Sequence, residues 1–253
     1  MKKSIWIVIL LFAIWGGILL LLPGEPKQQD AAPAISSTPI SSTAPTAPPS
    51  YLARIDQATW DYYKLIALQN EYGAASSQGS VKKWMDSISV FVGIYHTDED
   101  LHIISKHIED LNKVPGIPAI SITDSSENAN VTILFITQAD MNQMTADHGE
   151  IAHGYTTVWW DQGSITKSEI YIVYDEQTQL ERQHTLLEEM TQARGLLNDA
   201  ILYDDSIFYV EYKPDILSLS SMDWKLLEIH YSDLIEPGMK EAAGEDLYRQ
   251  AHL

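Results

Sequence analysis

The sequence predicts an α+β domain built on a mixed β-sheet, with its helices mainly on one face of that sheet. Three observations support this fold class. In several short stretches apolar residues alternate with other residues, as they do in half-buried strands. In other stretches apolar residues recur at helical intervals after capping signatures. The elements follow the order strand, helix, three or four strands, helix, loop, helix, an order typical of α+β domains.

Residues 1–22 predict an N-terminal transmembrane anchor. Lys2 and Lys3 precede an uncharged run of about 19 residues, which is long enough to cross the hydrocarbon core of a bilayer. The run ends at a Pro-Gly-Glu-Pro sequence without a clear cleavage signal, so we expect an uncleaved signal anchor; the alternative is a cleaved signal peptide. Because the lysines precede the span, the positive-inside rule predicts a single-pass protein of the inner (cytoplasmic) membrane. The rest of the chain would then face the periplasm or the cell exterior.

Residues 23–50 predict a disordered linker. Seven of the 11 prolines of the chain fall in this segment, together with Ser, Thr and Ala and almost no large apolar residue. Such a composition cannot bury enough apolar surface to offset the entropy lost on ordering. We therefore expect an extended tether between the anchor and the folded part.

The folded part is expected to begin near residue 81. A helix-and-loop spacer is predicted over residues 51–80, the compact domain over 81–240 and a C-terminal tail over 241–253. Strands are predicted at 84–94, 120–123, 131–137, 155–160 and 169–174. Helices are predicted from Thr97 to about Pro115, from Asp175 to Gly195 and from Ser220 to about Tyr231, because each begins with a capping signature.

Composition excludes several classes of protein and site. The chain has no cysteine, which rules out disulfides, thiolate metal sites and a cysteine nucleophile. The 35 acidic residues against 16 basic ones argue against nucleic acid as a partner, since its phosphates attract basic patches. Contact with the membrane is expected through the N-terminal helix.

The stretch from Leu186 to Asp199 carries the strongest motif. We interpret it as the end of an amphipathic helix that turns at Gly195, because glycine tolerates the left-handed conformation on which helices often end. Its spacing is that of the metalloprotease motif H-E-x-x-H-x-x-G-x-x-H, with Glu189 at the position of the general base. The three histidine positions are occupied by Glu188, Gln192 and Asn198.

With this helix, the order of elements resembles the metzincin branch of the zinc peptidases, most nearly the matrixin type. Residues 154–174 resemble the two strands ahead of the active-site helix, one of which lines the substrate cleft. Phe208 falls where metzincins have the methionine of their methionine turn. The resemblance implies a zincin fold with a degenerate zinc motif.

A nearer resemblance is to the bacterial envelope family catalogued as domain of unknown function 2927 (DUF2927). The shared residues are the run L-E-E-x-x-Q-x-x-G-L-x-N-D at 187–199, D-S-I-F at 205–208, Asp223-Trp224, and Tyr231 through Met239. This resemblance covers roughly residues 81–239. It implies a fold and no specific activity.

The donors in the motif do not suit a conventional zinc peptidase. In such an enzyme two histidines four residues apart share one helical face, and the glutamate between them polarises a zinc-bound water. Here the oxygen donors of Glu188, Gln192 and Asp199 suit calcium better than zinc, and Asn198 is a poor third ligand. Binding of no metal, of zinc and of calcium all stay open. A buried Glu189 acting as a general acid or base without metal is a further alternative.

An aromatic strand is expected to line the cleft. It contains Tyr155, Trp159 and Trp160. One tryptophan is expected in the core, and the other is expected to stack on a sugar ring or a peptide side chain. The function we expect is a non-catalytic module that binds a peptide or an envelope polymer or serves in assembly. An atypical hydrolase and a structural envelope protein are the alternatives.

Overall fold

The computed structural model describes residues 51–69, 79–146, 152–211 and 213–253. The predicted anchor and linker, residues 1–50, lie outside these ranges. Within the described ranges, no helix is both long enough and apolar enough to cross a bilayer.

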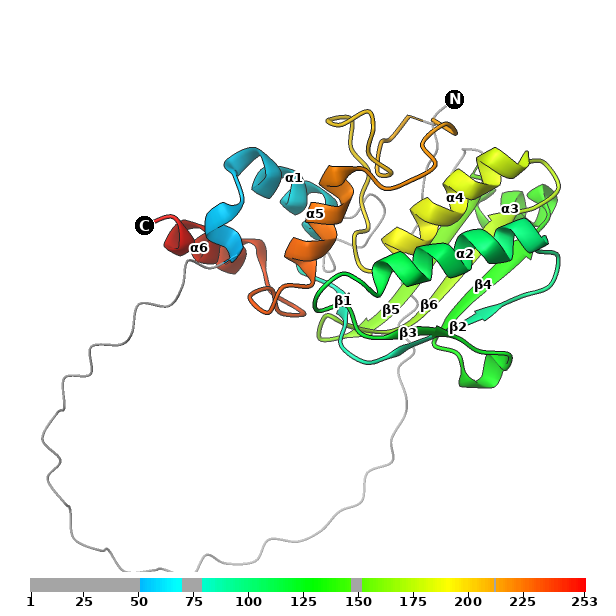
Figure 1. Cartoon of the computed structure of the whole chain (residues 1–253), viewed down its shortest axis with the longest axis horizontal. Helices are drawn as coiled ribbons and strands as arrows, with labels where there is room; N and C mark the ends of the chain where they lie inside the picture. Colours follow the sequence, from blue (N-terminus) through cyan, green and yellow to red (C-terminus); the bar gives the residue numbers. More distant parts are fainter. Residues whose placement is uncertain (1–50, 70–78, 147–151, 212) are drawn as a thin grey trace, which may run out of the picture. The chain divides into compact units, whose positions relative to one another are not determined.

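A six-stranded mixed sheet lies at the centre of the described structure (Figure 1). Its strands are β1 (Lys83–Trp84), β2 (Ile88–Val92), β3 (Ile120–Ile122), β4 (Val131–Ile136), β5 (Gly154–Asp161) and β6 (Ser164–Val173). Parallel pairing gives the order β1-β6-β4-β2-β3, and β5 pairs antiparallel with β6. Because β4 and β5 pair with the same residues of β6, they lie on its two opposite sides. The predicted mixed sheet is therefore confirmed.

The helices of the described part are short, and several carry strong N-terminal caps. They are α1 (Gln57–Leu68), α2 (Asp98–Leu111), α3 (Gln138–Met144), α4 (Gln179–Gln192), α5 (Ser221–His230) and α6 (Glu241–Ala251). The 3-10 helices η1 (Tyr51–Arg54) and η2 (Ser126–Asn128) complete the set. Thr97 and Ser220 cap α2 and α5 with capping boxes, as the sequence predicted.

Helices α2 and α4 lie side by side across one face of the sheet (Figure 1). The residues of β4 show the consequence of this packing. Val131, Ile133 and Phe135 are buried in the main core, whereas the residues between them are only partly buried. The alternation follows from the two-residue period of a strand with one covered face.

Two sequence-based boundaries of elements need correction. The strand expected at 84–94 is two strands: β1 pairs with β6, and β2 pairs with β3 and β4. Helix α4 begins after Thr178 and not at Asp175. The Asp175 carboxylate instead accepts a hydrogen bond from the backbone N–H of Gln138, at 2.8 Å, and so serves α3.

The first and last helices pack into the same core as the sheet. Trp60 of α1 is fully buried, stacks on Tyr248 of α6 at 5.0 Å between ring centroids, and donates its indole N–H to Glu245 at 3.0 Å. Residues expected to form a spacer and a tail therefore share the core of residues 81–240.

Candidate functional site

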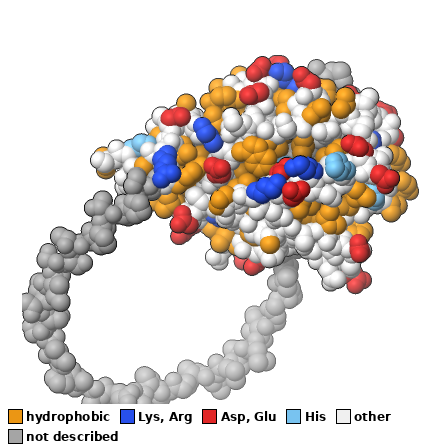
Figure 2. Space-filling model, viewed as in Figure 1, with side chains coloured by type: hydrophobic (Ala, Val, Ile, Leu, Met, Phe, Trp, Pro, Cys, Tyr) orange, Lys and Arg blue, Asp and Glu red, His pale blue; other side chains and the backbone are white. Residues whose placement is uncertain are grey.

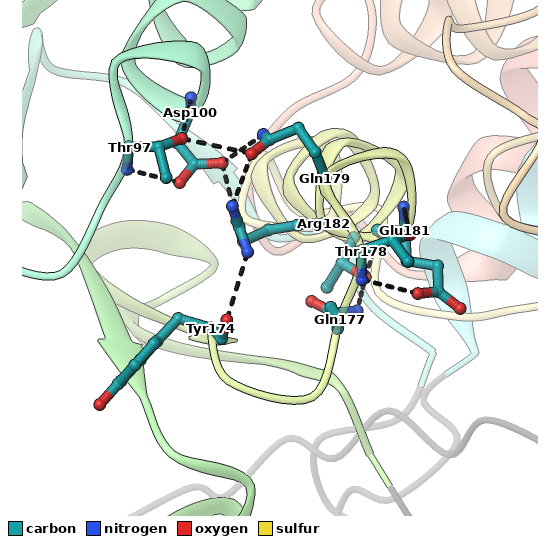
Figure 3. Close-up of polar contacts among 9 residues, drawn as sticks. Thr97, Asp100, Tyr174, Gln177, Thr178, Gln179, Glu181 and Arg182 are labelled. Atoms are coloured by element: carbon teal, nitrogen blue, oxygen red, sulfur yellow. Dashed lines mark hydrogen bonds and ion pairs between the residues drawn. The ribbon is translucent and has the colours of Figure 1, made fainter.

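Helix α4, which carries the motif glutamates, is fastened to α2 at its N-terminal end (Figure 3). The Arg182 guanidinium donates to the Asp100 carboxylate at 2.8 Å, and both side chains are almost completely buried, at 8% and 0% exposure. Gln179 also donates to Asp100, at 2.7 Å, and accepts from Arg182. Asp100 is itself part of the capping box of α2 with Thr97. A buried ion pair thus joins the first turns of the two helices.

The charge on Asp100 is stabilised by this network. Burial raises the pKa of its carboxyl, but hydrogen bonds from Arg182, Thr97 and Gln179 outweigh burial and hold the pKa below its ordinary value. Asp100 is therefore ionised at neutral pH, and the pair with Arg182 is a true ion pair.

The C-terminal end of α4 is held by two side chains from distant parts of the chain. Trp84 donates its indole N–H to the carbonyl of Ala193 at 2.8 Å, and the Tyr231 hydroxyl donates to the carbonyl of Arg194 at 2.9 Å. These bonds satisfy carbonyls that a helix end leaves unpaired. Gly195 then turns the chain at φ 103°, where a Cβ atom would lie 1.7 Å from the carbonyl oxygen of Lys82. Only glycine fits at this position.

His230 lies beneath this turn as a neutral structural residue. Its Nε2 lies 2.9 Å from the carbonyl oxygen of Lys82 and its Nδ1 3.2 Å from the Tyr63 hydroxyl. Burial lowers the pKa of His230 to about 3, so the ring is neutral at pH 7. Because a carbonyl only accepts, Nε2 carries the proton and Nδ1 accepts from Tyr63.

The four residues predicted as metal ligands are all buried, and two of them contact each other. Gln192 donates its side-chain amide to Asp199 Oδ1 at 3.0 Å. Asn198 donates to the carbonyl of Leu65 at 2.9 Å and so holds the end of α1. One turn before Gln192, Glu188 Oε2 lies 3.6 Å from His184 Nε2.

Among the described residues, no three His, Cys, Asp or Glu side chains are grouped as a metal site requires. The Gln192 amide N–H donates to Asp199, whereas Gln192 Oε1 is buried and has no hydrogen-bond partner among the described residues. This oxygen therefore keeps its lone pairs.

Glu189, at the position of the general base, projects from α4 and packs against β5. It is 1% exposed. A Cβ atom on Gly154 would lie 2.4 Å from Glu189 Oε1, so the carboxylate lies directly against the backbone of β5. Thr156 of the same strand donates its hydroxyl to the Glu189 carbonyl at 3.1 Å. The edge strand therefore adjoins the helix as the resemblance implied, in direct contact with the glutamate.

The turn at the position of the methionine turn is held by Asp223. Its carboxylate accepts hydrogen bonds from the Ser206 hydroxyl and from the backbone N–H of Ile207 at 3.0 Å. Tyr62 donates its hydroxyl to Ser206 at 2.9 Å. Phe208 is completely buried in the main core. The motif residues of this turn thus have a structural role.

The three aromatic residues expected at the cleft point to different environments. Tyr155 is buried in a small second cluster with Met141. Trp160 packs against the main core, and the Lys82 ammonium lies 5.3 Å from its ring centroid. Trp159 is partly exposed under Lys167, at 4.7 Å. One tryptophan lies on each side of the strand, as the alternation of a strand requires.

Two features of this region were not found from the sequence. The partners Asp100 and Arg182 are 82 residues apart, so no local pattern indicates their pairing. Arg194, also in the motif stretch, is completely buried, and its Nε donates to the carbonyl of Met190 at 3.2 Å. Arg194 directly precedes the turn glycine, Gly195, and this local pattern does not distinguish a buried arginine from a surface one.

Comparisons with known proteins identify a family. The sequence model of the family described as protein of unknown function (DUF2927) matches residues 56–249. Comparison with curated proteins gives no match. Among solved structures, two of myroilysin are similar, each with 11% sequence identity. The first covers 60% of this chain and 83% of its own with a TM-score of 0.39, and the second covers 67% and 92% with a TM-score of 0.41. Since the family match spans more than half of the sequence, the chain belongs to the DUF2927 family.

Proposed function

We propose that this protein is a non-catalytic binding or assembly module of the bacterial envelope. In this proposal its domain has a metzincin-like fold in which the former catalytic helix, α4, has become a structural element. Residues 4–22 would anchor the protein in the inner membrane, with the folded part on the far side. The uncharged run after Lys2 and Lys3 supports the anchoring.

One observation carries the proposal: the polar side chains of α4 at the motif positions are buried against other parts of the fold. Gln192 is bonded to Asp199, and Glu189 lies against the backbone at Gly154. A hydrolase needs its general base within reach of a water molecule and a substrate. Glu189 is only 1% exposed, and β5 lies against its carboxylate.

An atypical hydrolase is the second candidate. It is supported by the antiparallel strand β5, which adjoins α4 and presents Gly154 and Thr156 to Glu189. In that case Glu189 would act as the base after β5 moves away from the helix, and a metal would be held by Glu188 with a donor from elsewhere.

The test combines metal analysis of the purified full chain with a Glu189→Gln variant. The substitution keeps the shape of the side chain and removes its basicity. For a binding module we expect no stoichiometric metal and full rescue of a deletion strain by the variant. Stoichiometric zinc or calcium together with a variant that fails to rescue would overturn the proposal in favour of the hydrolase.

A further inference from the structure

Three cavities adjoin one another between α2 and α5 and continue to Tyr51. Their volumes are about 440, 420 and 640 Å³, each within the range of known ligand sites. The first two share Asp110 and Trp224, and the last two share Pro115 and Glu228. We call this continuous depression the α2–α5 furrow. Figure 2 shows apolar side chains interspersed with acidic and basic ones on this side of the molecule.

The floor of the furrow is apolar and aromatic. Its apolar lining residues are Ile103, Leu187, Leu217, Leu219, Val114, Pro115, Pro118, Trp84, Met85 and Trp224. Trp224 lies at the junction of two cavities and is partly buried. Among the described residues its indole N–H has no acceptor, whereas the indole N–H groups of Trp60 and Trp84 each have one. A partly buried indole N–H of this kind can donate to the carbonyl of a ligand.

The rim of the furrow carries more free negative than free positive charge. Both exposed lysines of the rim are paired with one carboxylate: Lys106 and Lys113 lie 2.6 Å and 2.8 Å from Asp110 oxygens. Within the described ranges, three other rim carboxylates have no basic side chain at ion-pair distance. These are Glu99, Glu228 and Asp233. Glu228 accepts a hydrogen bond from the Tyr51 hydroxyl at 2.8 Å and keeps its negative charge unpaired by a basic side chain of the described part.

A buried cation in the furrow is not available to an anionic ligand. Lys83 lines the largest of the three cavities, but its ammonium donates to the carbonyls of His230, Ser232 and Ile235, at 3.3, 3.2 and 2.5 Å. An ammonium has three protons, so its donors are all used. The furrow therefore favours a cationic ligand over an anionic one.

We propose that the α2–α5 furrow binds an extended peptide segment that carries apolar side chains and at least one Lys or Arg. The stretch of α2 from Glu99 to Leu111 is about 18 Å long at about 1.5 Å per residue. An extended peptide rises about 3.3 Å per residue, so about five to six residues span this stretch and further ones reach the cavity at Tyr51. The basic side chain pairs with Glu228, and a peptide carbonyl accepts from Trp224. This inference rests on the proposed binding function and assigns its partner class.

A glycan strand fits the furrow less well than a peptide. A sugar chain presents hydroxyl groups on all sides, and each one buried without a hydrogen-bond partner costs free energy. The largest of the three cavities is lined mainly by apolar surface, and all three protons of its buried cation, Lys83, are already donated to carbonyls. Apolar peptide side chains carry no hydrogen-bonding groups, so their burial has no such cost.

The binding test uses the purified full chain in detergent and three probes. The first is a labelled synthetic peptide of about ten residues with alternating Leu, Pro and Lys; the second replaces every Lys by Glu; the third is chitohexaose. We expect the Lys peptide to bind, with an affinity that falls as salt is raised, and we expect no binding of the other two. Equal binding of both peptides, or binding of chitohexaose alone, would overturn the proposal, as would binding of none of the probes.

Variants locate the binding site. Glu228→Lys, on an exposed residue, and Trp224→Ala should each weaken binding of the Lys peptide by about tenfold or more, as hot-spot residues do. Glu127→Lys and Leu180→Ala, at exposed positions outside the furrow, are the matched controls and should bind as the unmodified chain does. Because Trp224→Ala can also perturb folding, Glu228→Lys decides the outcome, and unchanged binding by it contradicts the assignment. If Glu228→Lys binds the Lys peptide normally while Glu189→Gln still rescues the deletion strain, only the assignment of the furrow as the binding site is wrong. If Glu189→Gln fails to rescue, the proposed non-catalytic function is wrong.

Discussion

Replacing Asp100 by alanine leaves the Arg182 guanidinium buried without its carboxylate partner. The Arg182 side chain is 8% exposed and cannot reach bulk water without leaving the interface between α2 and α4. Breaking a buried ion pair in this way costs about 3–5 kcal/mol. The substitution also removes the acceptor in the capping box of α2, for a further loss of about 1 kcal/mol. We expect a destabilisation of about 4 kcal/mol or more from Asp100→Ala.

The matched control is Asp110→Ala on the same helix. Asp110 pairs with Lys106 and Lys113, but those lysines are more than half exposed, and exposed pairs contribute about 0–1 kcal/mol. A large difference between the two substitutions would therefore come from burial and not from the count of ion pairs.

Urea unfolding at pH 7 measures both effects. With a slope of about 2 kcal/mol per molar urea, a loss of 4 kcal/mol lowers the midpoint by about 2 M. The pKa of Asp100 is lowered in the folded state, so its contribution is present above its unfolded pKa of about 3.9 and is lost as pH falls through the folded pKa. The difference between Asp100→Asn and the unmodified chain should thus shrink in acid. A loss below 1 kcal/mol for Asp100→Ala, equal to that of Asp110→Ala, would refute the idea that this pair positions α4.

Three further predictions concern the other end of α4 and its surroundings. Gly195→Ala places a methyl group against the Lys82 carbonyl at positive φ, so we expect a loss of several kcal/mol or failure to fold, read from the urea midpoint. His107 and His230 are neutral in the fold because burial lowers the pKa of each to about 3. Unfolded histidine binds a proton below about pH 6.5, so stability should fall as pH drops from about 6.5 toward 3, and His107→Asn should reduce that slope. Asp223→Asn should destabilise by about 1–3 kcal/mol, because one carboxylate oxygen becomes an NH2 group and a donor of the turn loses its acceptor. A thermal midpoint equal to that of the unmodified chain would contradict this role of Asp223.

The sequence predicted those parts of the fold that depend on local patterns. Capping signatures at Thr97 and Ser220 located two helix starts, because a side chain that bonds its own first turn needs only neighbouring residues. For α4 the acidic residue Asp175 predicts a start three residues early, whereas Thr178 and Glu181 form the actual capping box, whose spacing is also visible in the sequence. Asp175 does not cap α4, because its carboxylate accepts a hydrogen bond from the backbone N–H of Gln138 at the start of α3.

Packing between distant segments was beyond local patterns. Nothing near Trp60 indicates that it stacks on Tyr248, so the first helix was expected to be a spacer and the last residues a tail. In the candidate site, the four-residue spacing of Glu188 and Gln192 indicated a shared helical face but not what that face contacts. The hydrogen bond from Gln192 to Asp199 required the three-dimensional structure, because the chain turns at Gly195 between them.

The central claim, that α4 is structural and that ligand binding lies elsewhere, is tested most directly by one comparison of rescue. Glu189→Gln and Glu228→Lys would be expressed at equal levels in a strain that lacks the gene, and growth under envelope stress would be measured. Our account predicts that Glu189→Gln rescues growth as fully as the unmodified gene and that Glu228→Lys does not. Loss of rescue by Glu189→Gln, with Glu228→Lys fully active, would contradict it.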